Sequence, residues 1–69
     1  MTNTNDAYKA CLEATRFSLE EALKVVTEAI SDLETHNRNT SVGGLLKADT
    51  PLETAQATYK AALAIHAMR

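Results

Sequence analysis

The chain has 69 residues, a length that allows one domain at most and only a modest core. Its hydrophobic fraction of 45% is too high for a disordered chain, but much of this fraction is alanine, and there is no Trp, one Phe and two Tyr. The net charge of −2 argues against non-specific binding to nucleic acid or to an anionic membrane. We therefore expect a thin core that a second copy of the chain, or a helical partner, would thicken.

The cysteine content and the first residues bear on the compartment. A single cysteine, Cys11, excludes an internal disulfide and any cysteine-based metal cluster. The N-terminal residues lack the basic and apolar regions of a signal peptide, and no apolar run approaches the roughly 20 residues needed to cross a bilayer. These features predict a cytoplasmic protein.

The first predicted element is a long helix over about residues 6–36, preceded by a polar lead-in over residues 1–5. Between residues 18 and 33, large apolar residues recur at steps of four and three, which is the spacing of one helical face. A helix cannot leave such a stripe in water, so we expect the second helix to cover it. The stripe consists of Leu19, Leu23, Val26, Ile30 and Leu33.

An alternative interpretation breaks this helix at Phe17–Ser18 and gives three helices. Ser18 and Glu21 have the spacing of a capping box, with Phe17 in the position before the cap. The continuous apolar phase and the absence of Gly or Pro favour one helix. On an unbroken helix Phe17 lies opposite the stripe, where an aromatic residue is either an isolated surface group or a partner contact.

Residues 37–49 are predicted to form a connector between the two helices. The segment HNRNTS contains poor helix formers with turn preferences, and Gly43–Gly44 is interpreted as the chain reversal because paired glycines permit positive φ. The glycine pair does not match a phosphate-binding loop, because no Lys-Ser/Thr follows and no strand precedes it. Leu45 and Leu46 are expected to tuck under the end of a hairpin.

The second helix is predicted over about residues 51–68. Thr50 is placed at the N-cap, Pro51 at the first helical position, and Glu53 completes a capping box. Two stripes run along this helix, so it can contact two neighbours. One stripe comprises Leu52, Ala55, Tyr59, Ala62, Leu63 and His66, and the other comprises Thr54, Thr58, Ala61, Ile65 and Met68.

The predicted fold is therefore a single all-α domain over residues 1–69, an antiparallel two-helix hairpin. Residues 1–36 carry three basic and seven acidic groups, and residues 37–69 carry four and two, so the halves have charges of −4 and +2. This difference favours antiparallel pairing of the halves or association of copies. A dimer of such hairpins would form a four-helix bundle.

The sequence offers little chemistry. Cys11 and His66 would lie at the same end of the hairpin, but no third group orients them and no oxyanion hole is evident, so no catalytic residue is assigned. His36 and His66 lie at opposite ends and cannot share a metal, and no cofactor or metal is predicted. DNA binding by a helix-turn-helix is disfavoured, because the connector is long and the second helix offers only Lys60 and Arg69.

Residues 55–65, AQATYKAALAI, resemble the C-terminal helices of bacterial flagellar rod and hook proteins, although the chain lacks the Asn-rich segment of their N-terminal halves. The two-helix plan also resembles type III secretion needle subunits and their small hairpin chaperones, without the Pro-x-Asn-Pro turn of the needle subunits. These resemblances imply a component or chaperone of a bacterial secretion-type assembly.

We predict a small helical interaction or assembly module without catalytic activity. Its predicted partner is a second copy, as a homodimer, or another helical protein, with no nucleic acid, membrane or small-molecule ligand. The secretion-type component is the alternative, and a small transcription-associated regulator is a lower one. The predicted partner-binding residues are Phe17, Tyr59, Ile65 and Met68.

Overall fold

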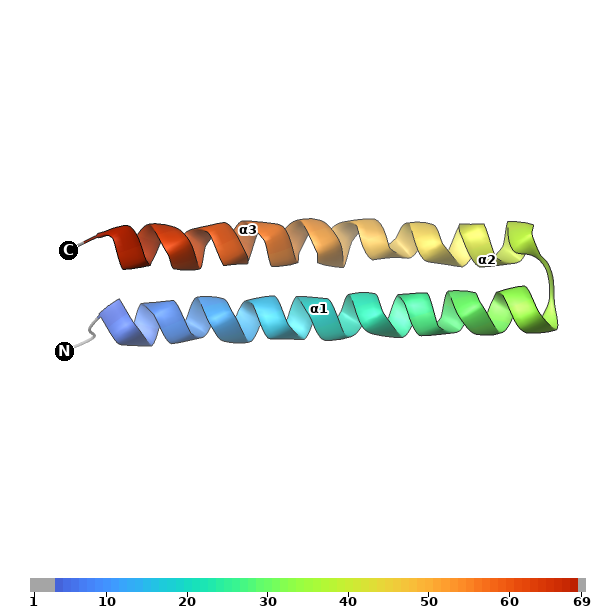
Figure 1. Cartoon of the computed structure of the whole chain (residues 1–69), viewed down its shortest axis with the longest axis horizontal. Coiled ribbons are helices and arrows are strands. Elements are labelled where there is room, and N and C mark those ends of the chain that lie inside the picture. Colours follow the sequence, from blue (N-terminus) through green and yellow to red (C-terminus); the bar gives the residue numbers. More distant parts are fainter. Residues whose placement is uncertain (1–3, 69) are drawn as a thin grey trace.

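The computed structural model describes residues 4–68 and is an all-α antiparallel hairpin (Figure 1). The first arm is α1, Thr4–Thr35. The second arm, residues 38–67, consists of α2 (Arg38–Leu45), a 3-10 turn (Leu46–Ala48) and α3 (Asp49–Ala67). α1 begins and α3 ends at the same end of the hairpin, which we call the open end. The predicted hairpin is confirmed.

α1 is continuous, so the alternative with a break at Phe17–Ser18 is wrong. Ser18 does not cap a helix; its side chain is buried between the two arms. The helix already begins at Thr4, within the predicted lead-in, whose residues 1–3 lie outside the described part of the chain. Its length follows from the absence of any Gly or Pro between residues 4 and 35.

The chain reverses at His36–Asn37 and not at the glycine pair. The backbone of Asn37 is extended, and its Oδ1 accepts a hydrogen bond from the backbone N–H of Thr40 at 2.8 Å, which caps α2. The predicted connector is therefore mostly helical. Gly43 and Gly44 lie within α2, and neither has a positive φ.

The second arm does not restart at Thr50 as predicted. α3 begins at Asp49, and the preceding residue, Ala48, provides no side-chain cap. Pro51 lacks an N–H and its ring crowds the carbonyl four residues earlier, at Lys47, which lies in the 3-10 turn. The tighter turn thus occurs where a regular α-helix would clash with the proline, and the arm continues through it.

The two arms meet along a seam of mostly small residues. In both arms the seam positions alternate in steps of three and four, which is the heptad spacing of packed helices. The buried side chains are five alanines and Ser18, and no large side chain among the described residues is fully buried. The seam consists of Cys11, Thr15, Ser18, Ala22, Val25, Ala29 and Asp32 on α1, and of Ser41, Gly44, Ala48, Pro51, Ala55, Thr58, Ala62 and Ile65 on the second arm.

Within residues 4–68, hydrogen bonds at two positions along the seam define the register of the arms. The hydroxyl groups of Thr15 and Thr58 lie 2.6 Å apart, and Ser41 Oγ donates to the backbone carbonyl of Ala29 at 2.7 Å. Small side chains allow the two backbones to approach closely enough for these contacts. The two arms are also in contact near the turn, where a Cβ added to Gly44 would lie 3.4 Å from Asp32 Oδ2.

The expectation that the second helix covers the large apolar stripe of α1 is wrong. The five residues of the stripe remain 38–65% exposed. The physical reason is that α1 carries two stripes, and the small-residue seam lets the arms come closer than the large side chains would. The large residues consequently lie beside the seam. The hairpin is a single layer of two helices, with extents of 52 × 15 × 12 Å.

Candidate interaction surface

Large apolar side chains of both arms lie on one side of the hairpin, which we call the apolar face. On α1, the residues of this face directly follow the seam positions, with Thr15 as the exception. The residues of the second arm on this face also follow seam residues. Leu19, Leu52 and Tyr59 line one shallow depression of about 300 Å³, which places the two arms' residues on the same side. The apolar face consists of Leu12, Leu19, Leu23, Val26, Ile30 and Leu33 on α1, and of Val42, Leu45, Leu52, Tyr59 and Leu63 on the second arm, all 38–65% exposed.

The α1 half of this face is hollowed between its leucines. Leu12, Leu19 and Leu23 line a second depression of about 350 Å³ together with Arg16 and Glu20. Arg16 Nε and Glu20 Oε1 form an ion pair at 3.6 Å, and both side chains are mostly exposed, so the pair contributes little to stability. The leucines of the α1 half therefore share this depression with one ion pair.

The opposite face has a different composition. One hollow on this face, about 440 Å³, is lined by Phe17 and Val25 together with polar groups that include Glu21, Lys47 and Thr50. Phe17 is 65% exposed. It stands among short and charged side chains, so this face lacks the continuous row of large apolar residues found on the apolar face.

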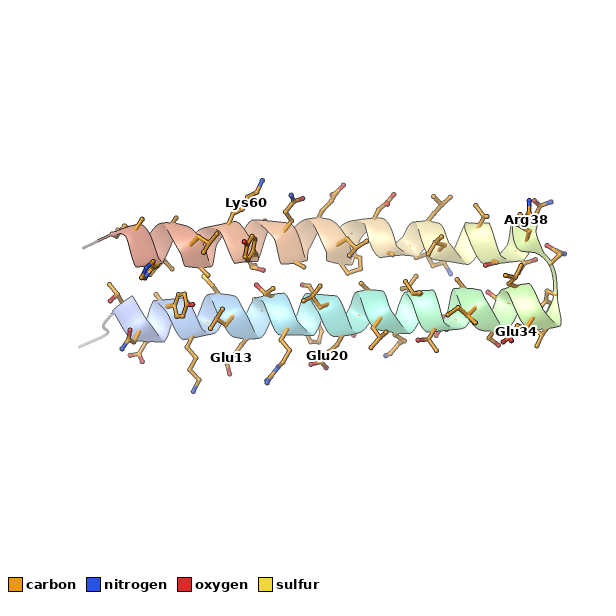
Figure 2. All side chains as sticks on the ribbon, in the orientation of Figure 1. Glu13, Glu20, Glu34, Arg38 and Lys60 are labelled. Carbon is orange, nitrogen blue, oxygen red and sulfur yellow. The ribbon has the colours of Figure 1, made fainter. Side chains whose placement is uncertain are left out.

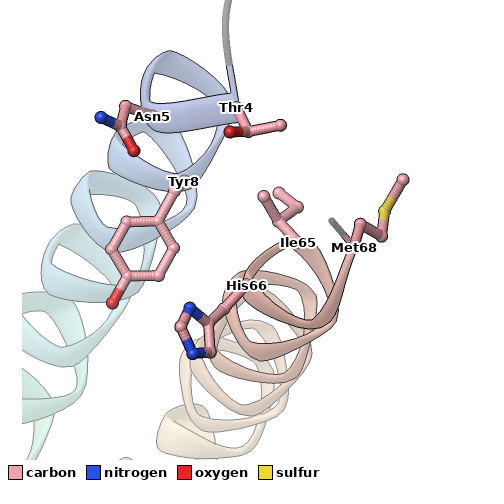
Figure 3. A pocket seen from close by; sticks show the side chains of 6 residues that line it. All are labelled: Thr4, Asn5, Tyr8, Ile65, His66 and Met68. Atoms are coloured by element: carbon pink, nitrogen blue, oxygen red, sulfur yellow. The ribbon is translucent and has the colours of Figure 1, made fainter.

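A further depression of about 400 Å³ lies at the open end, between the start of α1 and the end of α3 (Figure 3). Tyr8 lines it from α1, and Ile65 and His66 line it from α3. Met68, the residue after α3, lies at the same end. The depression is open to solvent and has no buried polar group within it, because each of its lining residues is at most half-buried.

The structure does not bring the four predicted partner-binding residues together. Tyr59 lies on the apolar face, Ile65 is half-buried in the seam, Phe17 is on the opposite face and Met68 is at the open end. Leu19, Leu23 and Leu33 of the apolar face were missed as surface residues, because the second helix was expected to cover their stripe. The seven-residue recurrence of small residues along both arms was the signal that would have identified them.

The thiol and imidazole groups of the described residues are spread along the hairpin. Cys11 is half-buried in the seam, and His36 and His66 lie at opposite ends of the hairpin. Among residues 4–68 no group of three or more His, Cys, Asp or Glu side chains is placed to hold a metal ion. Within the same residues no helix has the length and apolar character needed to cross a membrane.

Comparison with known proteins identifies no relative of this chain. No family model, no curated protein and no solved structure matches the chain.

Proposed function

We propose that this protein is a non-catalytic interaction or assembly module that binds its partner through the apolar face. The observation that supports this proposal is the exposure of eleven large apolar side chains on one side of a single helical layer. Monomeric proteins rarely expose contiguous apolar patches larger than a few hundred Å², and larger patches mark sites of protein or membrane interaction. Stable domains usually bury such a face against a second layer, and the described residues 4–68 form a single layer.

The distribution of charge supports a protein partner. Glu13, Glu20 and Glu34 point away from the second arm, and Arg38 and Lys60 point away from α1 (Figure 2). These five charges thus lie along the two outer edges, whereas the strip between them is mainly apolar, with Arg16 and Gln56 beside its leucines. An apolar centre with a polar rim is the arrangement found in protein–protein interfaces.

Site-specific photo-crosslinking in cells tests the proposal without knowledge of the partner. We expect benzoylphenylalanine at Leu23, the most exposed leucine of the apolar face, to capture a protein upon irradiation. The same group at Ala57, an exposed position on α3 away from this face, is the matched control and should capture little. Equal capture at both positions, or none at Leu23, would contradict the proposal.

The same reagent at Phe17 tests a separate prediction from the sequence. Capture at Phe17 at the level found for Leu23 would support a partner contact on the opposite face. Capture at the level of Ala57 would identify Phe17 as an isolated surface aromatic.

A further inference from the structure

We propose that a second copy of this chain covers the apolar face, with α1 of each copy lying on the second arm of the other and both turns at the same end. This inference rests on the proposed function and names the partner and its orientation. The product is a closed, two-fold symmetric bundle of four helical arms.

The exposed area of the chain is the first argument. The hairpin exposes 5487 Å², whereas a compact folded monomer of 7.5 kDa exposes about 4,200 Å². The excess of roughly 1,200 Å² is larger than the approximately 800 Å² that each partner contributes to a standard interface. The radius of gyration of 16.0 Å, against about 11 Å for a compact chain of this length, has the same origin. The area that the hairpin exposes beyond that of a compact chain is therefore at least as large as one partner's share of a standard interface.

The shape of the face favours a partner of the same length and form. The apolar residues begin near the open end at Leu12 and Leu63 and continue to Leu33 and Val42 beside the turn. A second hairpin presents an identical strip along its own 52 Å, so that a two-fold axis covers both strips at once. Because the continuous apolar strip occupies one side only, this association ends at two copies.

Charge distinguishes the two orientations available to such a pair. A two-fold axis perpendicular to the arms would stack α1 on α1 of the other copy, and thus place two segments of charge −4 together. An axis parallel to the arms instead stacks α1 on the second arm, whose half of the chain has a charge of +2. The parallel axis is therefore the electrostatically favoured one.

Individual side chains agree with the parallel axis. The contact between Thr15 and Thr58 places Glu13 and Lys60 at nearly the same level along the hairpin, on opposite outer edges (Figure 2). Stacking α1 on the second arm of the other copy brings these two edges together, so that Glu13 faces Lys60 twice in the dimer. Glu34 and Arg38 are related in the same way at the turn end. Glu20 then lies near Glu53, and its existing ion pair with Arg16 offsets part of that repulsion.

Sedimentation equilibrium of the purified chain tests the presence of the second copy. We expect a reversible monomer–dimer equilibrium, loss of the dimer in Leu19→Lys, and retention of the dimer in Thr54→Lys, which places the same charge on the opposite face. A wild-type chain that remains monomeric, or one that forms indefinite polymers, would overturn the proposal. If the pure chain is monomeric and Leu23 crosslinks to a different protein, the homodimer proposal is wrong. The proposed interaction function is then still supported.

A charge-reversal pair tests the orientation and does not depend on the folding of Leu19→Lys. Glu13→Lys should weaken the dimer by about tenfold, because an attraction becomes a repulsion at two symmetric positions. Adding Lys60→Glu should restore the dissociation constant to within about threefold of the wild type. Equal weakening in the single and double variants would overturn the stacking of α1 on the second arm, and circular dichroism confirms that each variant remains helical.

Discussion

At the scale of single residues, the hydroxyl groups in the seam provide the directional contacts between the arms. Thr15 Oγ1 donates to the carbonyl of Cys11 at 2.8 Å, and Thr58 Oγ1 reaches the carbonyls of Thr54 and Ala55 at 3.0 and 3.2 Å. The two hydroxyls also contact one another. Each hydroxyl has one proton, so only one of them donates across the seam while the other accepts. The contact between Thr15 and Thr58 is therefore a single hydrogen bond that depends on both hydroxyl groups.

Replacing either threonine with valine removes this shared bond. We expect Thr15→Val and Thr58→Val each to reduce the free energy of unfolding by about 1 kcal/mol. The double variant should lose little more than either single variant, because the shared bond is already absent in each. Urea denaturation of the four proteins measures this coupling.

Thr27→Val is the control for the hydroxyl pair. Its hydroxyl donates to the carbonyl of Leu23 at 2.9 Å in an exposed position, and this bond does not cross the seam. The change in unfolding free energy should remain within about 0.5 kcal/mol. Strict additivity of the two seam substitutions would show that the threonines act independently.

At the scale of helices, the second arm contains two glycines in a position where the sequence suggested a turn. Their helical backbone is explained by the cap at Asn37, which satisfies the N–H of Thr40 directly after the reversal. Glycine in a helix interior costs up to about 1 kcal/mol relative to alanine. α2 therefore carries a local cost that its packing against α1 must offset.

The two glycines should respond differently to alanine. A Cβ at Gly43 meets no atom within 4 Å, whereas a Cβ at Gly44 lies 3.4 Å from Asp32 Oδ2. We expect Gly43→Ala to stabilise the protein by about 0.4–1 kcal/mol, which raises the Tm by a few degrees for a chain of this size. The gain for Gly44→Ala should be smaller, because the methyl group contacts the Asp32 carboxylate and removes water from it.

Thermal unfolding followed by circular dichroism compares these two variants directly. A lower Tm for Gly43→Ala would indicate that residue 43 does not keep its helical conformation in solution. Equal gains at both positions would show that the arm shifts freely to accommodate the second methyl group.

The helices illustrate which parts of the structure were accessible from the sequence. The existence of two antiparallel arms followed from apolar periodicity and from the absence of breaking residues in α1. The position of the turn was not predicted correctly, because the glycine pair is a stronger turn signal in the sequence than the N-cap residue Asn37. The packing side was also misassigned, because α1 carries a stripe of large residues and a stripe of small residues displaced by one position. The hydrophobic pattern of the sequence points to the large residues as the packing side. Close approach of the two backbones, however, requires the small residues.

The candidate site was only partly accessible for the same reason. Tyr59 was identified as a surface contact and does lie on the apolar face. Leu19, which lines the same hollow, was expected to be covered by the second helix, and Leu52 was placed in the same stripe as Tyr59 but was not predicted to bind a partner. A single sequence cannot show how many layers a helical protein has, and this number decides whether a leucine is buried or exposed.

At the scale of the whole molecule, a single layer has too little buried area to explain its own stability. The buried side chains are alanines and one serine, which contribute far less hydrophobic free energy than leucine. A second layer would bury the leucines of the apolar face and supply the missing contribution. Folding and dimerisation should therefore be coupled, so that the unfolding transition is from a dimer to two unfolded chains.

This coupling predicts that the Tm depends on protein concentration. Two chains of 69 residues have an unfolding enthalpy of about 100 kcal/mol near 60 °C, so a tenfold increase in concentration should raise the Tm by about 5 °C. Differential scanning calorimetry over a hundredfold range of concentration measures the slope. Thr54→Lys should keep this dependence, since its charge lies on the opposite face. A wild-type Tm that is constant over the whole range would show that the hairpin is stable alone and that its apolar face is not required for folding.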